Sequence, residues 1–266
     1  MHDRVPLSRD SLSTKAYQRL RRDLMEGRFQ PGQKLKLRDL ARELGTSPTP
    51  VREALARLVS DMALTQMDHH SVSVPPMTTQ RFVEIRDLRL ELEGRAAAAA
   101  ADKAGEAAIA ELTKIHASQM ALQEAGRWTE ALVEDQRFHL ALCACAEMPV
   151  LLRMVESLWM QIGPMQHALG LHRVAKEPGR HPHQIILDGL RKRDPKLTRH
   201  GLQQDLLVHS EPVVRFLEGQ EGRERPPAKP AKPRRQAIAP LIRVAERVKI
   251  GAPTLSDPRR TRVRPI

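Results

Sequence analysis

Asp135 and His139 are spaced so that their side chains could bind one metal ion together. They lie four residues apart in EDQRFHLAL, so a helix would place their carboxylate and imidazole on one face, one turn apart. Such a pair can bind one metal ion, although a D-x-x-x-H pair is more often an ordinary helix-surface interaction. Phe138 beside His139 favours a histidine that points into a helical core. His183, in HPHQIILDGL, shares a helical face with Leu187 and can face the same core.

A second set of side chains is suited to reading DNA. Thr49 and Arg52 are three residues apart, so they share one face of a helix whose other face carries Val51 and Leu55. Arginine fits the paired acceptors of guanine, and such a contact contributes about 1–3 kcal/mol of discrimination. Further candidates for base or phosphate contacts are Ser47, Glu53, Arg57 and the basic cluster Lys34, Lys36 and Arg38, whose alternative is a solvated basic face.

The elements that would position Thr49 and Arg52 form an N-terminal domain over residues 11–78. Helical periodicity predicts helices over 15–26 and 37–44, each followed by a glycine. A third helix begins at Pro48, with Ser47 as its N-cap. The short segments LTQM and SVSV then alternate as strands of a small hairpin would. Three short helices and a hairpin indicate a winged helix-turn-helix.

The rest of the chain divides into a helical body, 79–219, and a tail, 220–266. Helical periodicity predicts six helices, over 79–103, 106–125, 129–147, 150–168, 182–192 and 195–217. Together they are expected to form an antiparallel all-α bundle. Asp194-Pro195 marks the start of the last helix, and Pro212 predicts a kink or an early end. The tail holds 8 of the 20 prolines and is expected to be disordered. The predicted fold class is therefore mainly α.

Composition narrows the class of protein further. The chain has a net charge of +12, but 13 basic and 4 acidic residues fall within 219–266, whereas 81–218 hold 18 and 19. Polyanion contact is therefore expected at the ends of the chain. No apolar run is long enough for a membrane span, and the first residues do not resemble a secretory signal. Cys143 and Cys145 cannot form a disulfide framework or a cysteine zinc site, so we expect a reducing cytoplasm.

The run PGQKLKLRDLARELGTSPTPVREALARL resembles the DNA-binding domain of GntR-type bacterial transcription regulators. The resemblance implies that Arg38, Thr49 and Arg52 contact operator DNA in its major groove. It also implies that the wing tip, His69, His70 and Ser71, touches the minor groove. Three positions depart from the family pattern: Pro48 replaces an arginine, and Met62 and Ser71 replace glycines. These departures predict weaker or altered operator binding, for which the basic tail can compensate through phosphate contacts.

The body resembles the ligand-binding (FCD) domain of the FadR subfamily of these regulators. That domain carries D-x-x-x-H, then a second histidine segment, then a histidine on the last helix, and it commonly holds a divalent metal. The resemblance implies a ligand set of Asp135, His139, His183 and Asp205, where Asp205 replaces the last histidine of the family. This set is suited to Zn, Ni, Mn or Fe. His209, one turn after Asp205, is the fallback ligand.

The resemblance also implies a small carboxylate effector, with Arg89 as its clamp and Glu93 at the family's glutamate position. The alternative for Arg89 is an ion pair inside the bundle. Three further histidines of this region, His172, His181 and His200, lie in polar contexts and are expected to face solvent.

These patterns predict a dimeric, effector-responsive transcription regulator that binds double-stranded DNA, is not an enzyme and does not act at a membrane. One alternative is a constitutive DNA-binding regulator with a vestigial metal site, suggested by Asp205. Another is a helical metallohydrolase, against which the sequence offers no H-E-x-x-H motif and no separate base.

Overall fold

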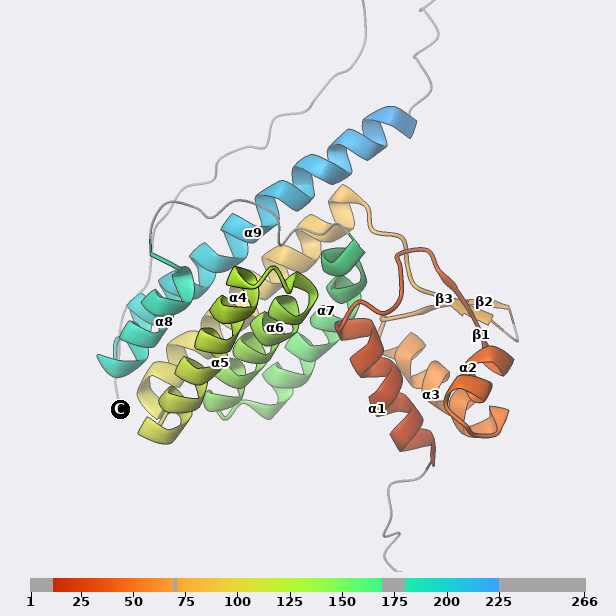
Figure 1. The fold of residues 1–266 in the computed structure, drawn as a ribbon, viewed down its shortest axis with the longest axis horizontal. Helices are drawn as coiled ribbons and strands as arrows, with labels where there is room; N and C mark the ends of the chain where they lie inside the picture. Colours follow the sequence, from red (N-terminus) through yellow and green to blue (C-terminus); the bar gives the residue numbers. More distant parts are fainter. Residues whose placement is uncertain (1–11, 69–70, 169–179, 225–266) are drawn as a thin grey trace, which may run out of the picture. The chain divides into compact units, whose positions relative to one another are not determined.

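The computed structural model of the chain describes residues 12–68, 71–168 and 180–224. Its first part contains three helices and three short strands, and its second part contains six helices (Figure 1). In chain order the first part is α1 (Leu12–Met25), β1 (Lys34–Lys36), α2 (Leu37–Glu43), α3 (Pro48–Ser60), β2 (Thr65–Asp68) and β3 (Ser71–Ser73). The second part is α4 (Thr79–Lys103), α5 (Glu106–Glu124), α6 (Trp128–Cys145), α7 (Pro149–Ala168), α8 (Pro182–Arg191) and α9 (Pro195–Glu224).

The N-terminal part is a winged helix-turn-helix, as predicted. α1 packs on α3 because Leu20 and Leu24 meet the buried face of α3, which carries Val51 and Leu58. β2 and β3 form the antiparallel wing, and the order of the sheet is β1-β3-β2. The sequence prediction missed β1, because a three-residue strand is too short to show a period of two.

Both ends of α3 depart from ideal helix ends. Ser47 is the N-cap and Pro48 opens the helix, as predicted, but the Ser47 side chain makes no capping hydrogen bond. After the helix, Met62 has a φ of +59°, a left-handed conformation that glycine adopts readily and other residues adopt at a cost. The resemblance placed a family glycine at this position, and the geometry explains why a glycine suits it.

We expect Met62→Gly to stabilise the protein. A left-handed conformation costs a non-glycine residue about 1–2 kcal/mol, and the greater flexibility of an unfolded glycine offsets about 0.5–1 kcal/mol of the relief. Met62 is 65% exposed, so little packing is lost. Urea unfolding should show a gain of about 0.5–1 kcal/mol. Met67→Gly, at an exposed strand position, is the control and should destabilise; a loss of stability in M62G would contradict the prediction.

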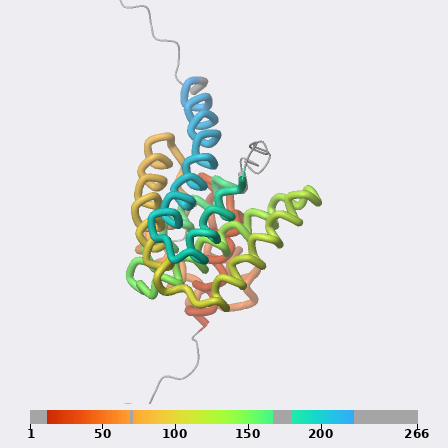
Figure 2. Tube along the Cα trace, turned by 90° about the vertical axis from the view of Figure 1, so that its left-hand side faces the viewer, coloured from red at the N-terminus to blue at the C-terminus, as the bar shows by residue number. Residues whose placement is uncertain are grey.

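The second part is a bundle of six helices, in agreement with the predicted number and class. α4 and α8 both pack along α9, and α5 packs along α6, as the two views in Figures 1 and 2 show. α8 can lie close to α9 because Gly201 has no side chain: a Cβ there would come within 2.9 Å of the backbone nitrogen of Ile186. This close approach places the start of α8 beside the first half of α9.

α9 is longer than predicted. Asp194 caps its start through a 3.0 Å hydrogen bond from the Leu197 backbone N–H to Oδ1, as expected. The prediction of an early end is wrong, because the helix continues through Pro212 to Glu224. Val213 and Leu217 are buried against the core after Pro212, and this packing outweighs the one hydrogen bond that proline removes. Residues 220–224 are thus helix rather than tail, and the rest of the predicted tail, 225–266, lies outside the described residues.

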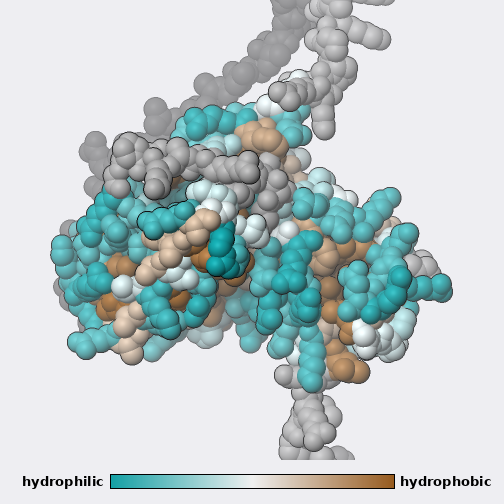
Figure 3. Space-filling model, viewed as in Figure 1, coloured by the Kyte–Doolittle hydropathy of each residue, from teal (hydrophilic) through white to brown (hydrophobic). Residues whose placement is uncertain are grey.

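None of the helices described in the structure combines the length and the apolar character that a membrane span requires. On the face drawn in Figure 3, hydrophilic residues cover most of the helices, and the hydrophobic ones show mainly as small areas between them.

α7 meets α1 in a backbone-to-backbone contact. A Cβ built on Gly163 would lie 2.5 Å from the carbonyl oxygen of Leu24 and 2.6 Å from that of Met25. The contact is flanked by two polar links: Arg21 pairs with Glu156 at 2.6 Å, and the Gln136 side chain donates to the Met25 carbonyl at 3.3 Å. Buried residues of the winged helix-turn-helix and of α7 therefore belong to one continuous core.

Gly163→Ala should destabilise the protein by about 1–3 kcal/mol, the usual cost of overpacking. Two main-chain carbonyls are in the way, and neither can rotate aside as a side chain would. Gly219→Ala is the matched control, because its Cβ would meet nothing within 4 Å and the same substitution should stabilise α9 slightly. Thermal unfolding of both variants tests this, and equal shifts would show that the contact is not tight.

Candidate functional site

The outer face of α3 presents Thr49 and Arg52 to solvent. Both are exposed, whereas Val51 and Leu55 on the opposite face are buried. The helical period of 3.6 residues places the two polar side chains on one side of the axis. The structure therefore leaves free the side chains that the sequence prediction assigns to base contacts.

A groove of about 460 Å³ separates α3 from the wing. Arg52 and Ala56 line one side of it, and Gln66, Met67 and Ser71 line the other. The Arg52 side chain therefore borders the space between α3, which is predicted to enter the major groove, and the wing, which is predicted to reach the minor groove. The predicted wing-tip contacts His69 and His70 lie outside the described residues.

Lys34 and Lys36 lie on one face of β1. Both are exposed, and Leu35 between them is buried, because side chains alternate across a strand. Arg38, in the first turn of α2, is also exposed. Predicted phosphate contacts thus come from a strand that the sequence analysis did not foresee.

Arg57 has a different environment from Arg52. Its guanidinium carbon lies 4.0 Å from the centroid of the Tyr17 ring, a cation–π contact with α1. The Tyr17 hydroxyl in turn donates to Asp61 at 2.7 Å. This arrangement gives Arg57 a structural partner within the domain, so its predicted role in DNA contact requires leaving that ring.

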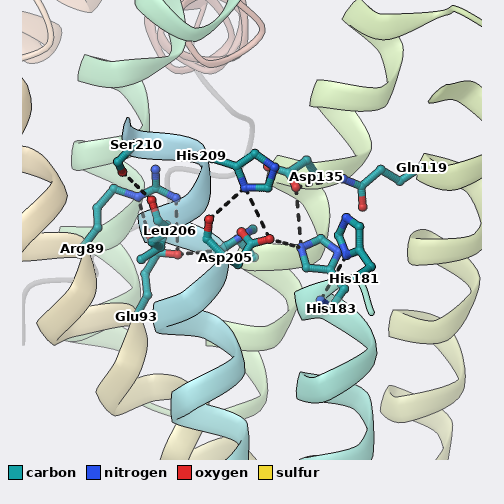
Figure 4. Close-up of polar contacts among 11 residues, drawn as sticks. Arg89, Glu93, Gln119, Asp135, His181, His183, Asp205, Leu206, His209 and Ser210 are labelled. Atoms are coloured by element: carbon teal, nitrogen blue, oxygen red, sulfur yellow. Dashed lines mark hydrogen bonds and ion pairs between the residues drawn. The ribbon is translucent and has the colours of Figure 1, made fainter. Parts of the chain in front are cut away.

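Four side chains from three helices converge in the six-helix part. Asp135 and His139 come from α6, His183 from the start of α8 and Asp205 from α9, and one ligand atom of each lies within 4.8 Å of the others. His183 Nε2 is 3.5 Å from Asp135 Oδ1 and 3.7 Å from Asp205 Oδ1. His139 Nε2 is 3.0 Å from Asp205 Oδ2. Figure 4 shows His183 and Asp205 facing each other with Asp135 beside them.

This group contains buried polar atoms that no described residue satisfies. His183 is fully buried, and neither of its ring nitrogens has a hydrogen-bond partner among the described residues. Asp205 is 2% exposed, and its Oδ1 also lacks such a partner. An unmet donor or acceptor in a protein interior costs about 1–3 kcal/mol, so these atoms need a ligand, an ion or water.

The four residues fit a divalent transition metal. Ligand atoms bound at about 2.0–2.2 Å lie about 3–3.5 Å apart, close to the distances between the donors here. Two imidazoles and two carboxylates suit Zn, Ni, Mn and Fe. Their helices, α6, α8 and α9, would be joined by the ion.

A second layer of side chains orients these donors. Glu93 Oε2 lies 2.8 Å from His139 Nδ1, and the Gln119 side chain donates to Asp135 Oδ1 at 2.9 Å. The Arg89 guanidinium donates from Nε to Glu93 Oε1 at 2.6 Å and lies 3.9 Å from the Trp159 ring centroid. A carboxylate on the far nitrogen of a ligating histidine fixes the ring and raises its basicity.

Burial and charge set the protonation of the group. Burial opposes the charged form of His139, but hydrogen bonds with Asp205 and Glu93 outweigh it and raise the pKa of His139 to about 10. Burial would raise the pKa of Glu93, but Arg89 and His139 reverse this effect and lower it. Burial raises the pKa of Asp135 and holds the pKa of His183 well below its usual range.

Two predicted residues lie beside the group rather than in it. Arg89 forms the ion pair inside the bundle that the sequence analysis left open, and it is only 3% exposed. Its predicted effector role therefore requires a carboxylate that replaces or shares Glu93. His209, the fallback ligand, has an exposed side chain whose Nδ1 lies 2.8 Å from the carbonyl oxygen of Asp205.

Sequence reasoning missed four neighbours of this group. The prediction that His181 faces solvent is wrong. The residue is half-buried and caps α8, and its ring lies 4.7 Å from that of His183. His116 and Gln119, one turn apart on α5, are buried. Glu93 is also buried; the resemblance placed it at the family's glutamate position but predicted no role for it. The signal for His116 and Gln119 was the buried helical face they share with Leu112. His200 is exposed, as predicted, and His172 lies outside the described residues.

Comparisons with known proteins cover both parts of the chain. Residues 12–74 match the family described as bacterial regulatory proteins, gntR family, and residues 84–207 match the FCD domain. The chain is 33% identical over 196 residues to the HTH-type transcriptional regulator McbR of Escherichia coli strain K12, which is 73% of this chain and 89% of that protein.

Two further matches extend this result. The chain is 28% identical over 154 residues to the HTH-type transcriptional repressor GlaR of Escherichia coli strain K12, covering 55% of this chain and 69% of that protein. Among solved structures, E. coli McbR/YncC has a TM-score of 0.69 at 31% identity, covering 79% of this chain and 99% of that one. A GntR regulator from Rhodococcus sp. RHA1, at 21% identity and a TM-score of 0.64, covers 77% of this chain and 98% of its own and supports the fold alone.

Proposed function

The chain belongs to the gntR family of bacterial regulatory proteins, and we propose that a small carboxylate effector, held beside a divalent metal ion in its FCD domain, controls its binding to operator DNA. The protein is a DNA-binding transcription regulator. Its relatives are regulators rather than enzymes, which confirms the family prediction and gives the metallohydrolase alternative no support.

The convergence of Asp135, His139, His183 and Asp205 supports the metal part of this proposal. These donors come from three helices, are largely buried and leave Asp205 Oδ1 and His183 Nε2 without hydrogen-bond partners among the described residues. A bound divalent ion would supply a positive charge that attracts oxygen ligands such as a carboxylate. The four side chains would hold the ion, and Glu93 would orient His139 from behind.

The effector part rests on the charge around that ion. An effector carboxylate could bind the ion directly and accept from Arg89, provided that the guanidinium moves away from Glu93. Effector binding would then shift the population of conformations of the helical domain. We expect a homodimer in the bacterial cytoplasm, whose two winged helix-turn-helix domains bind a two-fold operator with Thr49, Arg52, Lys34, Lys36 and Arg38.

A metal-and-effector titration on an operator fragment tests this function. The fragment is first selected from random duplex DNA by the purified protein. Metal-free protein, prepared with a chelator, should take up one ion per chain from Zn, Ni, Mn or Fe and gain about 2.7 kcal/mol of stability when free metal exceeds its Kd a hundredfold. One member of a panel of small carboxylates should then change the operator Kd by at least about fivefold.

Asp135→Asn is the informative variant and Asp102→Asn, at an exposed site on α4, is its control. The first should lose Mn(II) uptake and the effector response while it still binds the operator, and the second should keep all three. Unchanged stability and operator binding with every metal and carboxylate would contradict the proposal. That result would instead favour a constitutive regulator in which the polar residues satisfy one another, as His139 and Asp205 already do.

A further inference from the structure

A set of three histidines lies directly beside the candidate metal centre. His116 on α5 and His181 at the N-cap of α8 face His183, with ring centroids 5.4 and 4.7 Å from that of His183. The His116 and His181 rings are 4.9 Å apart. One nitrogen from each of the three lies within 4.8 Å of the others, so the three could hold one ion without Asp135 or Asp205. We call His116, His181 and His183 the three-histidine set.

Buried atoms without partners indicate that this set also needs a ligand. His116 is 6% exposed, and its Nδ1 has no hydrogen-bond partner among the described residues. Both nitrogens of His183 are in the same state, as is the Gln119 oxygen nearby on α5. The carboxylates of the first group can satisfy only the Nε2 side of His183, from 3.5 Å and beyond.

Metal binding by His181 would require the exchange of a hydrogen bond. Its Nδ1 accepts a 3.1 Å hydrogen bond from the His183 backbone N–H, which caps α8. A neutral imidazole has only one acceptor nitrogen, so metal binding by His181 must replace this weak cap bond. A bond to a metal ion is far stronger than one such hydrogen bond, and the remainder of α8 is held by packing on α9.

We propose that the three-histidine set is an alternative metal position, made only of nitrogen donors, next to the carboxylate-rich one. The two positions share His183, so one ion occupies either, and the identity of the metal selects between them. Metals that favour imidazole, Cu(II) above all, would take the three-histidine set, whereas Mn(II), which favours oxygen, would stay with Asp135 and Asp205. This position lies between α5 and α8, whereas the first joins α6, α8 and α9.

Paired variants and two metals test this proposal on the full chain. His181→Asn removes the imidazole and retains a good N-cap residue, so α8 should remain folded. It should weaken Cu(II) binding at least about tenfold and leave Mn(II) binding unchanged. Asp135→Asn combined with Asp205→Asn should abolish Mn(II) binding and retain one Cu(II) per chain. His200→Ala, an exposed histidine on α9, is the control and should change neither.

Elemental analysis gives the number of ions, and electron paramagnetic resonance of Cu(II) reports its nitrogen ligands. Three nitrogens in the wild type, and fewer in H181N and in His116→Leu, are the expected result. The proposal is overturned if H181N binds Cu(II) as well as H200A does, if it weakens both metals equally, or if the double asparagine variant loses Cu(II). A protein that binds Cu(II) but no Mn(II) would refute the proposed carboxylate centre and leave the three-histidine set intact, so the two proposals can fail separately.

Discussion

Replacing Glu93 with leucine should destabilise the protein by about 3–5 kcal/mol, the cost of leaving one member of a buried ion pair without its partner. Glu93 is fully buried and Arg89 is 3% exposed, and their side chains meet at 2.6 Å. Without the carboxylate, the guanidinium keeps its contact with the Trp159 ring but loses its counter-charge. Urea unfolding followed by circular dichroism measures the loss.

A double-mutant cycle separates the pair from general packing damage. The double variant Glu93→Leu, Arg89→Leu should be less destabilised than the sum of the two single variants, by about 1–3 kcal/mol, because it leaves no unpaired guanidinium. Glu111→Leu is the matched control: its carboxylate meets Arg137 at the same 2.6 Å, but both side chains are about half-exposed, so it should cost less than about 1 kcal/mol. Equal losses in E93L and E111L would show that burial of the pair is unimportant.

Arg52→Ala should weaken operator binding by about 1–3 kcal/mol, a factor of about 5–150 in Kd. Arg52 is exposed on α3 and lines the groove toward the wing, where a guanidinium can reach base edges. Fluorescence anisotropy on the selected operator gives the affinity, and single base changes in that operator show where specificity relaxes. A loss confined to one or two base positions is expected for R52A.

Lys36→Ala provides the contrast expected of a phosphate contact. It should weaken binding to all sequences alike and reduce the slope of log K against log salt by about 1. Arg153→Ala, at an exposed position on α7, controls for the loss of one positive charge and should leave the affinity nearly unchanged. If R52A and R153A behave alike, Arg52 does not contact the operator.

The helices were largely predictable because their hydrophobic period and end signals are local. The range 79–103 was correct at both ends, since Thr78 caps the helix through a hydrogen bond from Arg81 and Ala104 ends it. Two features depend instead on tertiary contacts. β1 exists through its pairing with β3, and α9 continues past Pro212 through the packing of Val213 and Leu217. Neither contact is visible in a window of neighbouring residues.

The candidate metal centre was predictable only in part. The spacing predicted Asp135 and His139, and the resemblance predicted Asp205. The structure brings these three residues together with His183. The surrounding residues come from α4, α5 and the cap of α8, which no local pattern connects to α6. Polar context suggested that His181 faces solvent, but its ring lies 4.7 Å from that of His183 and caps α8.

The contact at Gly163 has a mechanical consequence. Trp159, one turn earlier on α7, stacks against Arg89 and has its ring centroid 5.5 Å from that of His139. A rearrangement of the Arg89–Glu93 pair would therefore act on α7 through that ring. Because the main chains of α7 and α1 touch at Gly163, no side chain lies between them at that point to absorb a displacement. A shift of a few tenths of an ångström near Arg89 would thus displace α1, the helix that packs on α3.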